Sequence, residues 1–78
     1  MSDHYRKTNI QPIEVIADWD LNFALGNAIK YIGRYRDKGG IEDLIKASWY
    51  LAYEITGSIV EADENKAMLD RLNGGKKA

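Results

Sequence analysis

The sequence has no cysteine, one proline and one histidine among its 78 residues. The lack of cysteine excludes disulfides and thiolate zinc sites, and with a single histidine as well a zinc site is not expected. No uncharged apolar run approaches the about 20 residues that cross a bilayer, and the polar first residues do not resemble a secretory signal. Neither a phosphate-binding P-loop nor a glycine-rich dinucleotide motif is present. We therefore expect a cytoplasmic protein with no metal site and no known catalytic motif.

The composition predicts one small globular domain over residues 1–78. Apolar residues make up 45% of the chain and charged residues 29%, while the formal net charge is −1. A protein that coats nucleic acid would need a strong basic excess, so this class of partner is not expected. A chain of this length buries little surface on folding and has no disulfide to compensate. We therefore expect it to form a homo-oligomer.

The apolar residues recur at helical spacing almost throughout, which predicts an all-α fold of three or four helices. Residues 1–11 are expected to form an N-terminal arm. Pro12 suits the first turn of a helix over 12–19, and Asn22 is a candidate N-cap for a second helix over 22–38. Gly39-Gly40 would end this helix and join it to the next one in an antiparallel hairpin, with the first helix packed over the pair.

The third helical segment is predicted over 41–72, and two alternatives remain open at Gly57. Gly57 either weakens one long helix or ends it, because Ser58 and Glu61 have the spacing of a capping box that would start a fourth helix. Residues 73–78, with two glycines and two lysines, are expected to form a loose tail.

The second helix carries a local excess of positive charge in a chain that is acidic overall. Lys30, Arg34 and Lys38 recur every four residues and would form a basic ridge. Such a ridge suits a phosphate group, because arginine offers paired hydrogen bonds and lysine a point charge. Asn27 and Tyr31 flank the ridge and are candidates to contact a base or ribose. The alternative is a solvated helix face whose cations only favour the end of the helix.

Other candidates lie on both sides of this ridge. Lys46, on the third helix, is expected to add to the phosphate site, and the aromatic residues of that helix either pack in an interface or stack on a base. His4 is either a group that titrates near neutral pH or an exposed residue of the N-terminal arm. Gly26 and Gly33, one heptad apart, admit either another helix or a ligand. The aromatic candidates are Trp49, Tyr50 and Tyr53.

The order of these motifs resembles the SaV-like family of small bacteriophage proteins. The resemblance covers about residues 4–53, and nothing after Tyr53 contributes to it. It rests on His4-Tyr5, on Gly26-Asn27-Ala28-Ile29-Lys30-Tyr31-Ile32 with Arg34, on Lys38-Gly39-Gly40, on Glu42-Asp43-Leu44-Ile45-Lys46-Ala47 and on Trp49-Tyr50-Leu51. It implies a phage protein that acts in an infected bacterial cell.

Members of that family are mostly of unknown function, although some longer ones are described as phage nucleotide kinases, and one lineage is linked to an abortive-infection system. If the shared motif marks a nucleotide site, the resemblance implies a site made of His4, Tyr5, Asn27, Lys30, Arg34, Lys38 and Lys46.

Three functions are consistent with the sequence. The first is a phage accessory protein that binds a nucleotide or another phosphate-bearing small molecule, for example to sequester a host immune signal. The second is a deoxynucleoside monophosphate kinase, in which Glu42 or Asp43 would hold Mg²⁺ with the nucleotide. The third is a module that binds a host protein through the third helix.

Overall fold

Four helices make up the part of the chain that the computed structural model describes, residues 10–74. No strand occurs among these residues, so the predicted all-α fold is confirmed. The helices are α1 (Pro12–Asp18), α2 (Phe23–Arg34), α3 (Ile41–Thr56) and α4 (Ile59–Asn73).

The helix starts follow from capping residues that the sequence displays. Pro12 occupies the first turn of α1, where its missing N–H costs no hydrogen bond. The Asn22 side chain accepts a hydrogen bond from the Leu25 N–H at 2.9 Å and so caps α2. Ser58 caps α4 by accepting from the Glu61 N–H, and Gly57 ends α3 in the left-handed conformation with φ of 70°. Of the two alternatives at Gly57, the structure therefore has the break.

The second helix ends at Arg34, and its prediction to Lys38 was wrong. The Asp37 and Lys38 N–H groups both donate to the Arg34 carbonyl, and the Gly40 N–H donates to the Tyr35 carbonyl. These bonds close a series of turns between α2 and α3. Lys38 consequently lies in the connection between α2 and α3.

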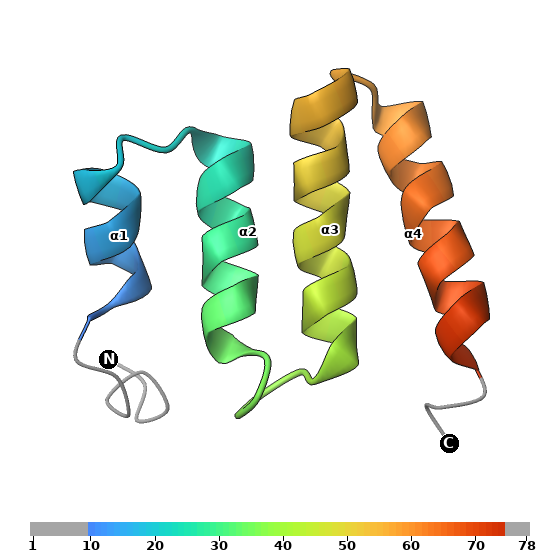
Figure 1. The fold of residues 1–78 in the computed structure, drawn as a ribbon, viewed down its shortest axis with the longest axis horizontal. Coiled ribbons are helices and arrows are strands. Elements are labelled where there is room, and N and C mark those ends of the chain that lie inside the picture. The colour runs from blue at the N-terminus through green and yellow to red at the C-terminus, as the bar shows by residue number, and fades with distance from the viewer. Residues whose placement is uncertain (1–9, 75–78) are drawn as a thin grey trace.

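The helices stand side by side in a single layer (Figure 1). Each contacts only its neighbours in sequence, and the layer measures 34 × 32 × 13 Å. α2 and α3 form the expected antiparallel hairpin. The first helix does not cover this hairpin as predicted, because α1 packs against α2 alone and extends the layer sideways.

Close contact between α1 and α2 explains two glycines. A Cβ at Gly26 would lie 3.3 Å from Ile16 Cγ2, and one at Gly33 would lie 3.4 Å from Pro12 Cγ. Both positions therefore face α1, which agrees with the helix-packing alternative.

The fully buried apolar side chains are few and small, and they lie between adjacent helices. The buried apolar residues are Ala24, Ala28, Ile45, Ala47 and Ala62.

Within residues 10–74, no helix combines the length and apolar content needed to cross a bilayer.

Candidate functional site

Three cationic side chains surround one tyrosine ring where α2 faces α3. Lys30 Nζ lies 4.7 Å from the centroid of the Tyr31 ring, Lys46 Nζ lies 5.4 Å from it, and Arg34 Cζ lies 5.7 Å from it. Tyr31 in turn stacks on Tyr50, with 6.1 Å between the ring centroids and 16° between their planes. We call these five residues the basic–aromatic cluster.

Arg34 is held in this cluster by a buried carboxylate. Its Nε donates to Asp43 Oδ2 at 3.0 Å, and the Gly39 N–H donates to the same oxygen at 2.9 Å. The Asp43 side chain is only 1% exposed, whereas that of Arg34 is 27% exposed. Asp43 therefore ties the end of α2 to the start of α3 and leaves part of the guanidinium facing solvent.

The two lysines of the cluster differ from Arg34 in their charge partners among residues 10–74. No salt bridge within residues 10–74 involves Lys30 or Lys46. The ring face attracts both ammonium groups, a contact worth about 0.5–1 kcal/mol at an exposed site. Together with the Arg34 guanidinium they gather three positive charges around one ring, and such a local concentration attracts anions. The cluster is thus suited to a phosphate, which could take donors from two lysines and an arginine.

An aromatic groove continues from the cluster toward the start of α2. Tyr50 links the two parts, because its ring makes T-shaped contacts with the rings of Trp49 and Phe23 at centroid distances of 5.2 and 6.4 Å. Trp49 stacks on Tyr53 with 3° between the planes, and its indole N–H donates to Asp63 of α4 at 2.9 Å. These aromatic residues line an open hollow of about 430 Å³.

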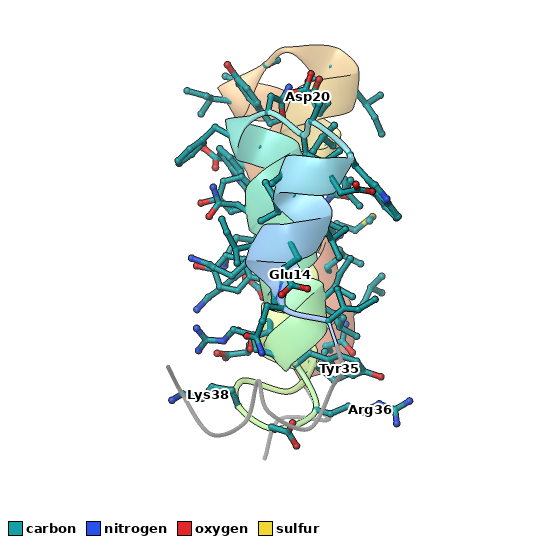
Figure 2. The ribbon with its side chains drawn as sticks, turned by 90° about the vertical axis from the view of Figure 1, so that its left-hand side faces the viewer. Glu14, Asp20, Tyr35, Arg36 and Lys38 are labelled. Atoms are coloured by element: carbon teal, nitrogen blue, oxygen red, sulfur yellow. The ribbon has the colours of Figure 1, made fainter. Side chains whose placement is uncertain are left out.

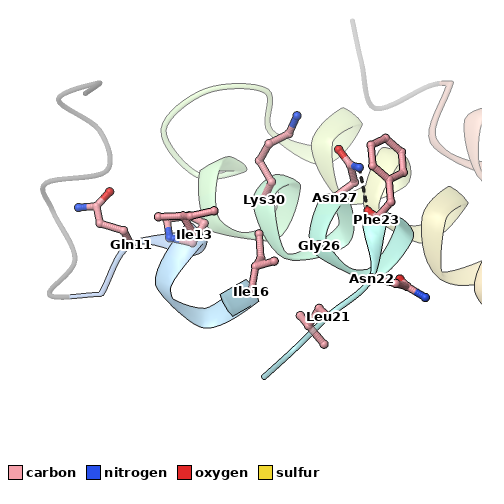
Figure 3. A pocket seen from close by; sticks show the side chains of 10 residues that line it. Gln11, Ile13, Ile16, Leu21, Asn22, Phe23, Gly26, Asn27 and Lys30 are labelled. Atoms are coloured by element: carbon pink, nitrogen blue, oxygen red, sulfur yellow. Dashed lines mark hydrogen bonds between the residues drawn. The ribbon is translucent and has the colours of Figure 1, made fainter. Parts of the chain in front are cut away.

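A second hollow, of about 560 Å³, lies between α1 and α2 (Figure 3). Ile13 and Ile16 form its α1 side, and Phe23 and Lys30 lie on its α2 side. The Asn27 amide, also at its edge, donates to the Phe23 carbonyl of its own helix at 2.9 Å. This hollow is mainly apolar, so it offers little for a phosphate to bind.

Comparison with known proteins identifies a family for this chain. The family described as protein of unknown function (DUF3310) matches residues 1–52. The chain belongs to the DUF3310 family. No curated protein and no solved structure matches it. The DUF3310 match contains α1, α2 and most of α3, and therefore the whole basic–aromatic cluster, whereas α4 with Asp63 lies beyond it.

The structure brings together four of the eight predicted phosphate-binding residues, all of them within the DUF3310 region. Lys30, Tyr31, Arg34 and Lys46 meet in the cluster. Asn27 lies beside the α1–α2 hollow instead. His4 and Tyr5 lie outside the described residues, so their place in a site stays a prediction.

Lys38 was expected to continue the ridge of Lys30 and Arg34; it lies in the turns beyond the end of α2, and its part in a site stays a prediction. Figure 2 shows Lys38 in the turn below the helices, projecting to the opposite side of the layer from Tyr35 and Arg36. α2 itself ends at Arg34. Lys46, on the neighbouring helix, supplies the third cation of the cluster.

Two contributors to this region were not recognised as such in the sequence. Phe23 is 80% exposed and forms one wall of the aromatic groove, but it resembles an ordinary first-turn residue. Asp43 was a candidate for holding Mg²⁺, yet it is buried against Arg34 and Gly39. The spacing of Gly39 and Asp43, four residues apart around a helix start, is the feature that could have indicated this role. Among residues 10–74, no group of three or more potential metal ligands occurs.

Proposed function

We propose that this protein binds a nucleotide, or a similar phosphate-bearing small molecule, across the basic–aromatic cluster and the adjoining aromatic groove. The observation that carries the proposal is the set of three cations within 6 Å of the Tyr31 ring, in a chain of net charge −1. Concentrating positive charge locally in an acidic protein favours a defined anion site over general adhesion to polyanions.

The neighbouring groove favours a ligand that carries a base. Aromatic faces stack on nucleobases with about 1–3 kcal/mol per base, and the groove presents several such side chains close to the cations. Tyr50 touches both Tyr31 and Trp49, so the phosphate and base regions are separated by a single ring. Two carboxylates hold side chains of the groove in place: Glu54 accepts a hydrogen bond from Asn22, and Asp63 accepts one from Trp49.

The biological setting proposed for this binding follows from the family resemblance. The chain would be a phage accessory protein in the cytoplasm of an infected bacterial cell, acting as a homo-oligomer. Sequestration of a nucleotide signal of host immunity suits a small protein with no recognised catalytic motif. His4 and Tyr5 would complete the site from the N-terminal arm.

Kinase activity is the second candidate, and the position of Asp43 weighs against it. A phosphoryl-transfer enzyme needs carboxylates that hold Mg²⁺ beside the nucleotide. Asp43 directs one oxygen to both Arg34 and Gly39 and is almost fully buried, so it is not free for that role. Of the two acids proposed for Mg²⁺, only Glu42 is exposed. A protein-binding module is the third candidate, supported by the aromatic side chains at the surface of α3.

The test is a binding titration with mono-, tri- and cyclic nucleotides, with and without Mg²⁺, on the full chain and three variants. We expect Lys30→Ala and Lys46→Ala each to weaken binding about tenfold, which corresponds to about 1.4 kcal/mol. Arg71→Ala is the matched control, because it removes an exposed cation of α4 that lies outside the cluster. Arg34 is unsuitable for this purpose, since its loss would also leave Asp43 buried without its charged partner.

Chromatography of the bound and free fractions separates the candidates. An unchanged nucleotide that travels with the protein, and is lost in the lysine variants, supports binding without turnover. A new phosphorylated product in the presence of ATP supports the kinase instead. Absence of binding by every nucleotide at millimolar concentration, or equal affinity in all three variants, would overturn the nucleotide proposal.

A further inference from the structure

The two faces of the helix layer carry different chemistry. Two residues along a helix correspond to a rotation of about 200°, so side chains two positions apart point to opposite faces. Phe23 and Lys30 lie on the face of the basic–aromatic cluster, and Leu25 and Ile32 follow them by two positions. The same offset on α3 and α4 defines an aliphatic face opposite the cluster, formed by Leu25, Ile32, Leu51, Ile55, Met68 and Leu72.

This aliphatic face is open to solvent in the single chain. Ile55 is 82% exposed and Leu72 is 65% exposed, while Ile32, Leu51 and Met68 are each between 40 and 45% exposed. Helical domains normally bury such side chains against a second layer of structure, and here no second layer exists within residues 10–74. The aliphatic face is therefore apolar surface that a helical domain would normally bury in its core.

A second copy of the chain has the properties needed to cover it. The six residues that define the face are apolar, and a second copy presents the same apolar surface to match it. One charged residue, Glu61, precedes Met68 by seven positions and lies on the same side of α4. The broad side of the layer spans 34 by 32 Å, an outline of roughly 1,000 Å², which is of the same order as the about 800 Å² per partner of a standard stable interface. The single chain has a small buried core, and self-association would supply the missing burial.

We propose that two copies pack through their aliphatic faces into a two-layer dimer, which leaves both basic–aromatic clusters on the outside. The helix layers would then lie at the 8–10 Å axial separation typical of packed helices. The dimer would carry two separate and equivalent ligand sites on its opposite surfaces. This interface does not depend on what the clusters bind, so the two proposals can fail independently.

The first measurement is the mass of the full chain in solution, by sedimentation or light scattering at micromolar concentrations. We expect twice the chain mass of 8.8 kDa. Ile55→Glu places a carboxylate in the proposed interface and should weaken dimerisation on the order of 100-fold, because an unpaired charge is costly to bury. Val60→Glu is the matched control, since Val60 is also exposed, at 63%, but is not part of the aliphatic face.

A labelling experiment keeps the test valid if Ile55→Glu fails to fold. The chain contains no cysteine, so single variants Ile55→Cys and Val60→Cys each provide one thiol for maleimide. We expect the thiol at position 55 to react at least tenfold more slowly than the one at position 60, and to speed up on dilution. A monomeric wild-type chain at 100 micromolar, or equal reactivity of the two thiols in a dimer, would overturn the proposal.

Discussion

The chain reverses direction at both ends of α3, and the two turns are held together by different means. At the first turn, buried Asp43 accepts hydrogen bonds from Arg34 on α2 and from the Gly39 N–H in the connection. At the second, Gly57 takes the left-handed conformation and Ser58 caps α4 through its own side chain. One turn thus depends on a charge pair between two helices, and the other on local backbone geometry.

Only the first of these two turns shares a residue with the candidate site, so only there should the stability of the turn and the geometry of the site depend on the same contact. Arg34 belongs both to the first turn and to the basic–aromatic cluster, so the buried carboxylate also positions the cation beside Tyr31. The first turn lies inside the DUF3310 match, and the second turn lies outside it. Changes at the first turn should therefore be more damaging than changes at the second.

The largest effect is expected from Asp43→Asn. This substitution keeps the shape of the side chain but removes its charge, leaving Arg34 partly buried without a carboxylate. Breaking one partner of a buried ion pair typically costs about 3–5 kcal/mol, and part of the Arg34 pair remains exposed, so we expect a loss near 3 kcal/mol. Urea denaturation followed by circular dichroism measures it. Glu64→Gln, on the exposed side of α4, is the control and should change stability by less than about 0.5 kcal/mol.

A loss of less than about 1 kcal/mol for Asp43→Asn would mean that the pair contributes little more than an exposed one does. The contrast between the two turns would then disappear.

Gly39→Ala should have the next largest effect. A Cβ at this position would overlap the Asp43 carboxylate, which has to move away from the Gly39 N–H to make room. Overpacking of this kind costs about 1–3 kcal/mol. Gly74→Ala, where a Cβ meets no atom within 4 Å, is the control for the loss of glycine itself. Thermal denaturation of the two variants side by side gives the comparison, and equal melting temperatures would contradict the expectation.

The smallest effect is expected from Gly57→Ala at the second turn. No atom lies within 4 Å of the added Cβ, so the cost comes from the φ of 70° alone. The left-handed conformation costs a residue other than glycine about 1–2 kcal/mol, and asparagine tolerates it better. We expect Gly57→Asn to be more stable than Gly57→Ala in the same denaturation assay. If the alanine variant matches the wild type, the turn does not need this conformation.

The sequence predicted those parts of the fold that depend on neighbours along the chain. Asn22 and Ser58 cap helices in the structure because a cap needs only a side chain and the following N–H groups. The predicted end of α2 was too late because Lys38 has a helix-compatible side chain, and the residues between Arg34 and Gly39 include no glycine or proline that would indicate a turn. The position of α1 was wrong for a different reason, since an amphipathic pattern shows which side is buried but not which helix covers it.

The candidate site was predictable to a similar extent. Spacing along α2 placed Lys30 and Arg34 on one side, and the proximity of Lys46 followed from the hairpin. The stacking of Tyr31 on Tyr50 depends on the relative positions of two helices, which no spacing within either helix determines. The burial of Asp43 is also a property of the assembled turn, so it could be recognised only in three dimensions.

The single-layer arrangement also bears on how the chain folds. Every helix contacts only its neighbours in sequence, so native pairs are separated by short stretches of chain. Low separation of this kind is typical of helical proteins that fold within microseconds to milliseconds. α1 and α4 each rest on one neighbour, whereas α2 and α3 each have two. The outer helices should therefore detach first during native-state fluctuations, while the hairpin that carries the cluster stays folded.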